Sequence, residues 1–126
     1  MACRITELVL ECRDPDRLAE FWCAVLGYEV VLREGDDLEL GPPGGRFGDG
    51  AVTLVLARTD NPRRGRLPLH LDVSPAGCDQ ETELARLTDL GARPADVGQT
   101  GEESWVVLQD PEGNEFCLLR TDVGAA

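Results

Sequence analysis

The sequence predicts an α+β fold in which one β-α-β-β-β module occurs twice in tandem within 126 residues. The evidence is an internal repeat, because three features of the first half return in the second half at offsets of 62–64 residues. An alternating strand occurs at residues 7–12 and again at 70–74. A helix ends in Leu-Gly at 26–27 and another at 90–91. An apolar strand occurs at 53–58 and again at 115–120. Two copies are too few for a solenoid, and they predict two halves that can enclose a cleft.

The first module (about residues 4–58) is expected to begin with a strand at 5–12, where polar and apolar residues alternate. Asp14-Pro15 has the residue types of a helix start and Gly27 those of a helix end. The helix between them has an apolar stripe of Leu18, Phe21, Trp22 and Val25. Strands are expected at 28–33, 37–40 and 51–58, with a Pro- and Gly-rich loop at 41–50.

The second module (about residues 68–120) follows a linker at 59–67, so the chain is interpreted as a single domain of two modules. Its first strand is centred on His70-Leu-Asp-Val73 and has an apolar face of Leu69, Leu71 and Val73. Cys78 or Asp79 is expected to open the helix, whose stripe is Leu84, Leu87 and Leu90. Strands are expected at 92–97, 104–109 and 115–120, with a turn at 110–114.

Composition excludes several classes of function. Hydrophobic residues make up 42% and charged residues 29% of the chain, as in globular proteins. The formal net charge of −12 argues against nucleic acid as a partner, because binding phosphates needs a basic surface. The sequence has neither an apolar run of about 18 residues nor a signal-peptide core, so we expect no membrane partner and a cytoplasmic location.

The cysteines also agree with a cytoplasmic location. The five cysteines are an odd number and form no CxxC pair, which argues against a zinc finger and a disulfide framework. We expect reduced thiols, with Cys12 and Cys23 as small core residues.

Strand alternation predicts that one face of each sheet packs on its helix and leaves the other face for polar groups. The residues expected on this other face are Glu7, Glu11, His70, Asp72, Trp105, Gln109, Glu115 and Cys117. Carboxylates, the single histidine and a thiol on one face form a candidate site, although solvent exposure alone would also explain such a face.

Four motifs resemble the vicinal oxygen chelate superfamily of glyoxalases, bleomycin resistance proteins and extradiol dioxygenases. They cover about residues 4–120 and read Asp14-Pro-Asp-Arg-Leu-Ala-Glu-Phe-Trp22, Leu26-Gly27, His70-Leu-Asp-Val73 and Asp110-Pro-Glu-Gly-Asn-Glu-Phe-Cys117. The subtype looks like the glyoxalase-like proteins common in actinobacteria. The resemblance implies a curved mixed β-sheet that forms a cleft between the modules, with helices outside, and a homodimer.

In metal-using members, the first and last strands of each module supply the ligands. The resemblance places Glu7, His70 and Cys117 at three of these positions, whereas Val55, beside Thr53, occupies the fourth and cannot bind a metal. Glu7, His70 and Cys117 would suit zinc, and Glu7, His70 and Glu115 would suit a harder ion such as Mn or Fe(II). The cofactor is therefore none or one divalent metal (Zn, Mn, Fe or Ni), and both alternatives stay open.

The function expected from the resemblance is binding of a small oxygen-rich molecule in the cleft, without a complete metal site. An acidic interior would suit a cationic or polyhydroxylated ligand. Candidate catalytic residues are Glu115, as a general base, and His70, while Glu7, Glu11, Thr53, Val55, Asp72, Trp105, Gln109 and Cys117 are candidate ligand-binding residues. The alternatives are a divalent-metal-dependent lyase, isomerase or dioxygenase that uses Glu7, His70 and Glu115 or Cys117, and a purely structural dimer module.

Overall fold

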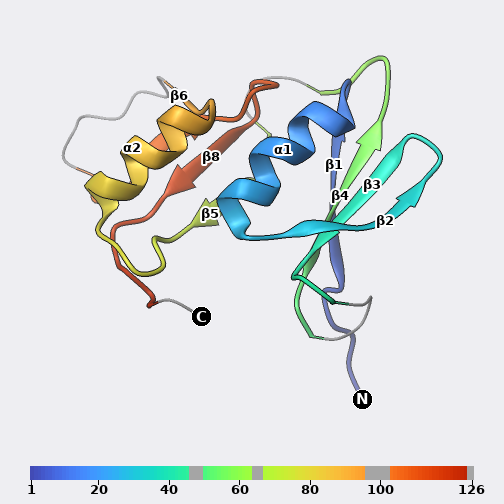
Figure 1. Ribbon diagram of the computed structural model, residues 1–126, viewed down its shortest axis with the longest axis horizontal. Helices are drawn as coiled ribbons and strands as arrows, with labels where there is room; N and C mark the ends of the chain where they lie inside the picture. Colours follow the sequence, from blue (N-terminus) through green and yellow to red (C-terminus); the bar gives the residue numbers. More distant parts are fainter. Residues whose placement is uncertain (46–49, 64–66, 96–102, 125–126) are drawn as a thin grey trace. The chain divides into compact units, whose positions relative to one another are not determined.

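The computed structural model describes residues 1–45, 50–63, 67–95 and 103–124 (Figure 1). It divides into two compact units, Met1–Arg63 and Arg64–Ala126, each with one helix and one four-stranded sheet. Parts of three predicted segments, 46–49 of the loop, 64–66 of the linker and 96–97 of a strand, lie outside the described residues.

The first unit contains every element predicted for it, with bounds that differ by one or two residues. These elements are β1 (Glu7–Cys12), α1 (Pro15–Leu26), β2 (Glu29–Glu34), β3 (Asp37–Gly41) and β4 (Thr53–Arg58). The strand order is β1-β4-β3-β2. The first and last strands of the unit, β1 and β4, are parallel neighbours, and the other pairs are antiparallel.

Helix α1 begins and ends at the residues that the sequence predicts. The Asp14 carboxylate accepts a hydrogen bond from the Arg17 amide at 3.2 Å, and Pro15 occupies the first turn, where no amide donor is needed. Gly27 ends the helix with φ 68°, a left-handed conformation that favours glycine. The helix therefore has a defined length and presents its apolar stripe to the sheet.

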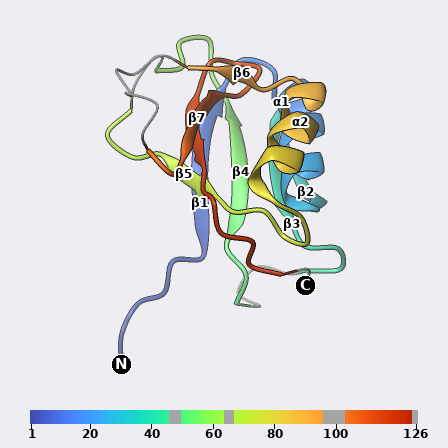
Figure 2. The same cartoon turned by 90° about the vertical axis from the view of Figure 1, so that its left-hand side faces the viewer.

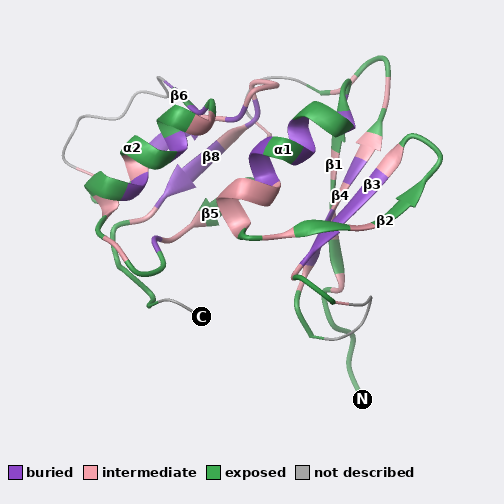
Figure 3. Cartoon of the chain, viewed as in Figure 1, coloured by how far each residue is buried: buried purple, intermediate pink, exposed green. Residues whose placement is uncertain are grey.

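The core of the first unit lies between α1 and strands β3 and β4, and the helix contacts both strands (Figure 3). Every second residue of these strands points toward the helix and is buried. The helix residues that face the sheet are buried as well. The buried residues are Cys12, Leu18, Phe21, Trp22, Leu38, Leu40, Leu54 and Leu56. The opposite face of this sheet, which the helix leaves uncovered, is called the helix-free face below.

The second unit repeats this architecture with shorter strands. Its elements are β5 (Leu71–Val73), α2 (Gln80–Leu90), β6 (Arg93–Pro94), β7 (Val106–Gln109) and β8 (Glu115–Leu118), in the sheet order β5-β8-β7-β6. Strands β5 and β8 are parallel, as β1 and β4 are. Helix α2 lies beside β8 in Figure 1, and Figure 2 shows α2 on one side of strands β5 and β7. The two sheets therefore confirm the prediction of two tandem β-α-β-β-β modules.

Strand registers match the internal repeat residue by residue. Val9 is paired with Val55 in the first unit, and Asp72 is paired with Cys117 in the second. These pairs are equivalent under the 62–64 residue offset of the repeat.

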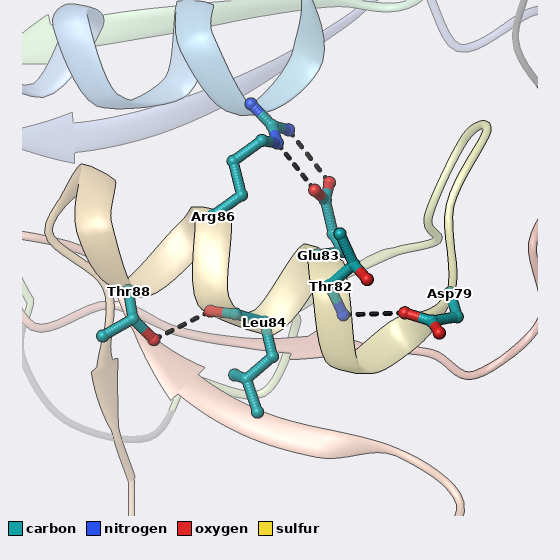
Figure 4. A network of polar contacts seen from close by, with 6 residues as sticks. All are labelled: Asp79, Thr82, Glu83, Leu84, Arg86 and Thr88. Atoms are coloured by element: carbon teal, nitrogen blue, oxygen red, sulfur yellow. Dashed lines mark hydrogen bonds and ion pairs between the residues drawn. The ribbon is translucent and has the colours of Figure 1, made fainter.

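Two details of the second unit differ from the prediction. Leu69 was expected in a core strand, but β5 begins only at Leu71, and Leu69 is 71% exposed. In α2, Leu87 is fully buried, whereas Leu84 and Leu90 are half-buried and Glu83 is buried. The side chain of Glu83 accepts two hydrogen bonds from Arg86, at 2.6 and 2.9 Å, which compensate for burying its charge (Figure 4).

None of the helices in the described ranges has the length and apolar character that crossing a bilayer requires.

Asp79 is the N-cap of α2 and supports a pH-dependent prediction. Its carboxylate accepts a hydrogen bond from the Thr82 amide at 2.8 Å (Figure 4). The side-chain and backbone hydrogen bonds from Thr82 lower the pKa of Asp79 from its ordinary value of 3.8. The ionised cap therefore stabilises the fold above pH 3.8, and this contribution is lost as the pH falls through the lower folded-state pKa.

We therefore expect Asp79→Asn to lower the urea midpoint at pH 7 and to have a smaller effect at about pH 2, because asparagine caps helices without a charge. Urea unfolding of both proteins across this pH range measures the difference. A difference that is the same at both ends of the range would contradict the prediction.

Asp110 holds the turn between β7 and β8. It is fully buried, and its Oδ1 accepts hydrogen bonds from the backbone amides of Glu112 and Asn114, both at 2.9 Å. The Asn114 side-chain amide donates to both carboxylate oxygens, at 3.1 and 2.9 Å. The Asp-Pro-Glu-Gly-Asn sequence therefore forms a turn because one carboxylate satisfies several buried donors.

We expect Asp110→Ala to lower the free energy of unfolding by about 3 kcal/mol, because it leaves buried donors without partners. Urea unfolding followed by circular dichroism measures this loss. Asp89→Ala, at an exposed position of α2, is the control and should change stability by less than about 0.5 kcal/mol. Equal effects of the two substitutions would contradict this assignment.

Candidate functional site

The clearest cluster of chemically active side chains lies in the second unit, on the face of its sheet that carries Asp72 and Cys117. These two residues are direct partners on the parallel strands β5 and β8. His70 directly precedes β5, and its Nε2 lies 3.1 Å from Asp72 Oδ1. The ligand atoms of His70, Asp72 and Cys117 all lie within 4.8 Å of one another. We call these three residues the His-Asp-Cys cluster.

The cluster combines accessible and buried groups. The side chains of His70 and Asp72 are 50% and 46% exposed, so a dissolved molecule can reach them. Cys117 is buried and forms a small apolar cluster with Ala95 and Val107, against which Leu119 packs. A thiol beside apolar groups and two polar groups at the surface can contact both parts of an amphipathic ligand.

The donor set fits a zinc ion. An imidazole nitrogen, a carboxylate oxygen and a thiolate sulfur are all ligands that zinc accepts, and three protein donors leave one position for water or substrate. A thiolate favours zinc over Mn or Mg, which prefer oxygen donors. Asp72 was expected to bind ligand rather than metal, so its place in this set is a new feature of the site.

Without a metal, the same geometry places a base beside the thiol. The sequence shows no base close to Cys117, but the fold brings His70 within 4.8 Å of it. The Asp72 carboxylate can orient the imidazole, as carboxylates do in nucleophile–histidine arrangements. The hypothesis that Cys117 acts as a nucleophile therefore gains a partner from the tertiary structure.

Other predicted residues of the second unit lie near the cluster in strand register. Glu115 is half-buried, lies two residues before Cys117 on the same face of β8, and is paired with Gln109 of β7. Trp105 lies one residue before β7 and is 44% exposed. Its indole is therefore accessible to a planar ligand.

The first unit places its predicted residues on its helix-free face. Glu7 and Thr53 are register partners, Val9 is paired with Val55, and Glu11 is exposed on the same face. Thr53 is buried, and its hydroxyl donates to the Thr6 carbonyl at 3.5 Å. By the repeat, Glu7, Val9 and Val55 are the equivalents of His70, Asp72 and Cys117, so the first unit does not contain a second such cluster.

Glu39 is a residue that the sequence-based reasoning missed. It lies in the middle of β3, paired with Val55, and is buried with 9% exposure. Its Oε2 has no hydrogen-bond partner in the described part of the chain. The Leu38-Glu39-Leu40 alternation could have revealed it, because the flanking leucines indicate which face the carboxylate occupies.

The expectation that Glu7 and His70 share one cavity stays a prediction. Glu7 belongs to the first unit and His70 to the second, and the structure describes each unit by itself.

Comparisons with known proteins identify the class of protein. The family model of the glyoxalase-like domain matches residues 7–119, and the chain therefore belongs to this family. Solved structures of the glyoxalase, bleomycin resistance and dioxygenase superfamily have the same fold, which confirms the resemblance to vicinal oxygen chelate proteins. No curated protein sequence matches the chain.

Three solved structures illustrate this likeness. A mutant of the fosfomycin resistance protein FosX from Listeria monocytogenes, complexed with Mn(II) and 1S,2S-dihydroxypropylphosphonic acid, is 14% identical, with a TM-score of 0.69 and coverage of 98% of this chain and 96% of that one. A glyoxalase/bleomycin resistance protein/dioxygenase family enzyme from Burkholderia phytofirmans is 15% identical, with a TM-score of 0.67 and coverage of 92% and 97%. The antibiotic binding protein TnmS3 from a Streptomyces species is 20% identical, with a TM-score of 0.62 and coverage of 99% and 98%. At these identities the likeness shows the fold alone.

The donor set gives a direct test of metal binding. If the cluster binds a metal, cobalt(II), a spectroscopic substitute for zinc, should produce a sulfur-to-cobalt charge-transfer band with the wild-type chain. Cys117→Ser should abolish this band, and His70→Ala should weaken cobalt binding at least about tenfold, because a ligand is lost. Cys3→Ser removes an exposed thiol and is the matched control, which should keep the band. A band that survives in Cys117→Ser would exclude the cluster as the metal site.

Proposed function

We propose that this glyoxalase-like protein binds a small oxygen-rich molecule at the His-Asp-Cys cluster, without the complete four-ligand metal site of metal-using relatives. The observation that carries the proposal is the His70–Asp72 pair, whose atoms lie 3.1 Å apart while both side chains stay about half exposed. Vicinal oxygens of a ligand can replace water at both groups, because the carboxylate accepts hydrogen bonds from hydroxyls and the imidazole can donate or accept.

Two further observations support binding rather than metal catalysis. The first unit has Val9 and Val55 at the positions equivalent to Asp72 and Cys117, so it offers no second set of donors at these positions. Among proteins of the same fold, TnmS3 is described as an antibiotic binding protein. We therefore regard sequestration of a metabolite or drug as the simplest role, in a homodimer and in the cytoplasm, two expectations that stay predictions.

The experiment is a binding titration that locates the ligand on the chain. Suitable probes are catechol, propane-1,2-diol and 1S,2S-dihydroxypropylphosphonic acid, the ligand in the FosX complex. We expect at least one probe to shift the backbone amide resonances of residues 70–73 and 115–118 in two-dimensional NMR spectra. His70→Ala and Asp72→Asn should weaken this binding about tenfold, since each removes a charge-assisted hydrogen bond.

Asp89→Asn, on the exposed surface of α2, is the matched control and should leave the titration unchanged. The proposal fails if none of the three probes shifts these resonances, or if binding is the same in His70→Ala as in the wild type.

A divalent-metal-dependent lyase, isomerase or dioxygenase is the second candidate, and the three-donor cluster specifically favours it. A bound ion would supply a Lewis acid that polarises the oxygens of the substrate. In that case His70, Asp72 and Cys117 would hold the ion, and Glu115, on the same face of β8, would be placed to move a proton. Glu7 was expected among the ligands, and its participation stays a prediction.

A further inference from the structure

We infer that Glu39, on the helix-free face of the first unit, recognises the positively charged nitrogen of an organic ligand, such as an ammonium or amidinium group with an apolar body. The inference goes beyond the proposed function, because it concerns a group that the first unit binds by itself, whereas the His-Asp-Cys cluster lies in the second unit. It arises from the buried Oε2 of Glu39, which has no hydrogen-bond partner among the described residues, and from the apolar residues next to it.

The position of Glu39 follows from strand alternation. Leu38 and Leu40 are 1% and 0% exposed and point toward α1, which contacts β3. Glu39 therefore points to the opposite, helix-free face of the sheet. It sits between its register partners Leu32 of β2 and Val55 of β4.

Burial makes this carboxylate unfavourable in the free protein. Glu39 is 9% exposed, and its Oε2 has no hydrogen-bond partner among the described residues. An ionised carboxylate removed from water without a partner destabilises a fold, and such groups are rare unless they serve a function. Arg33 and Arg58 of the adjacent strands lie on the other face, as register partners of the buried Leu38 and Cys12, and they pair with Asp16 and Asp60.

The residues around Glu39 indicate which kind of cation it receives. Its register partners Leu32 and Val55 are apolar, and so is Val9, the partner of Val55 on β1. Leu32 and Val9 are 52% and 60% exposed, so apolar surface is available beside the carboxylate. Ca²⁺ takes six to eight oxygen ligands and Mg²⁺ is held by carboxylates and water, whereas the register partners of Glu39 are apolar and favour a ligand with a hydrocarbon part.

An organic cation fits both the unpartnered Oε2 of Glu39 and the exposed apolar surface beside it. Its charged nitrogen donates hydrogen bonds to the carboxylate, and its hydrocarbon part covers the exposed Leu32 and Val9. An ion pair formed away from bulk water is stronger than one at an open surface. Glu7, exposed on β1 of the same face, adds negative charge that attracts a cation.

The test compares three probes of the same shape and different charge: benzylammonium, benzyl alcohol and benzoate. We expect benzylammonium to shift the NMR resonances of residues 37–41 and 53–57 and to bind at least tenfold more tightly than benzyl alcohol, with no binding of benzoate. Glu39→Gln should reduce benzylammonium binding at least tenfold. Glu20→Gln, the same charge change on the exposed surface of α1, should leave the binding unchanged.

A stability measurement separates recognition from a purely structural role. Glu39→Gln should raise the urea midpoint of the free protein, because it replaces a carboxylate whose Oε2 is buried without a partner by a neutral amide. If Glu39 were a structural residue, the same substitution would lower the midpoint. Equal binding of benzylammonium and benzyl alcohol, or unchanged binding in Glu39→Gln, would overturn the inference.

The two proposals fail in different ways. If diol probes still shift residues 70–73 while benzylammonium does not shift residues 37–41, the inference about Glu39 is wrong and small-molecule binding stands. If benzylammonium binds through Glu39 while no diol probe shifts the second unit, Glu39 is confirmed as a cation site and the oxygen-rich ligand is wrong.

Discussion

The parallel pairing of the first and last strand in each unit is the constraint on which the candidate site depends. A parallel neighbour cannot be reached by a tight turn, so the chain between the strands must form the helix and the two other strands. In the second unit this pairing sets Asp72 beside Cys117, although the two residues are far apart in the sequence. The single alternation that buries Phe116 and Leu118 leaves Cys117 and Asp72 on the other face.

The same constraint explains why two units of one fold can differ in chemistry. Helix-facing positions must be apolar in both units, because each sheet is stabilised by the helix that covers it. Positions on the opposite face have no such requirement. The second unit has a histidine, a carboxylate and a thiol there, whereas the equivalent positions of the first unit hold Glu7, Val9 and Val55. The fold is therefore duplicated while the donor set is confined to one copy.

The polar side chains of the two units have their hydrogen bonds satisfied to different degrees, and this difference separates structural from functional residues. Asp110 and Glu83 are buried and accept several hydrogen bonds from their own turn or helix, which is what a structural role requires. Glu39 is buried in the same way, but its Oε2 has no partner among the described residues. His70 and Asp72 contact each other while both stay accessible, as groups that meet a ligand must.

The sequence by itself determined the two modules, the start and end of α1, and the Asp110–Asn114 turn. These features depend on local rules, namely period-two alternation, helix capping and turn chemistry, which act over a few residues. It also identified His70, Asp72 and Cys117 as residues of one face. Only the tertiary structure decided that they form one cluster, because register between distant strands is fixed by packing across the whole sheet. For the same reason, the sequence did not predict Glu39 as a site residue. Its burial and the missing partner of its Oε2 depend on neighbouring strands rather than on adjacent residues.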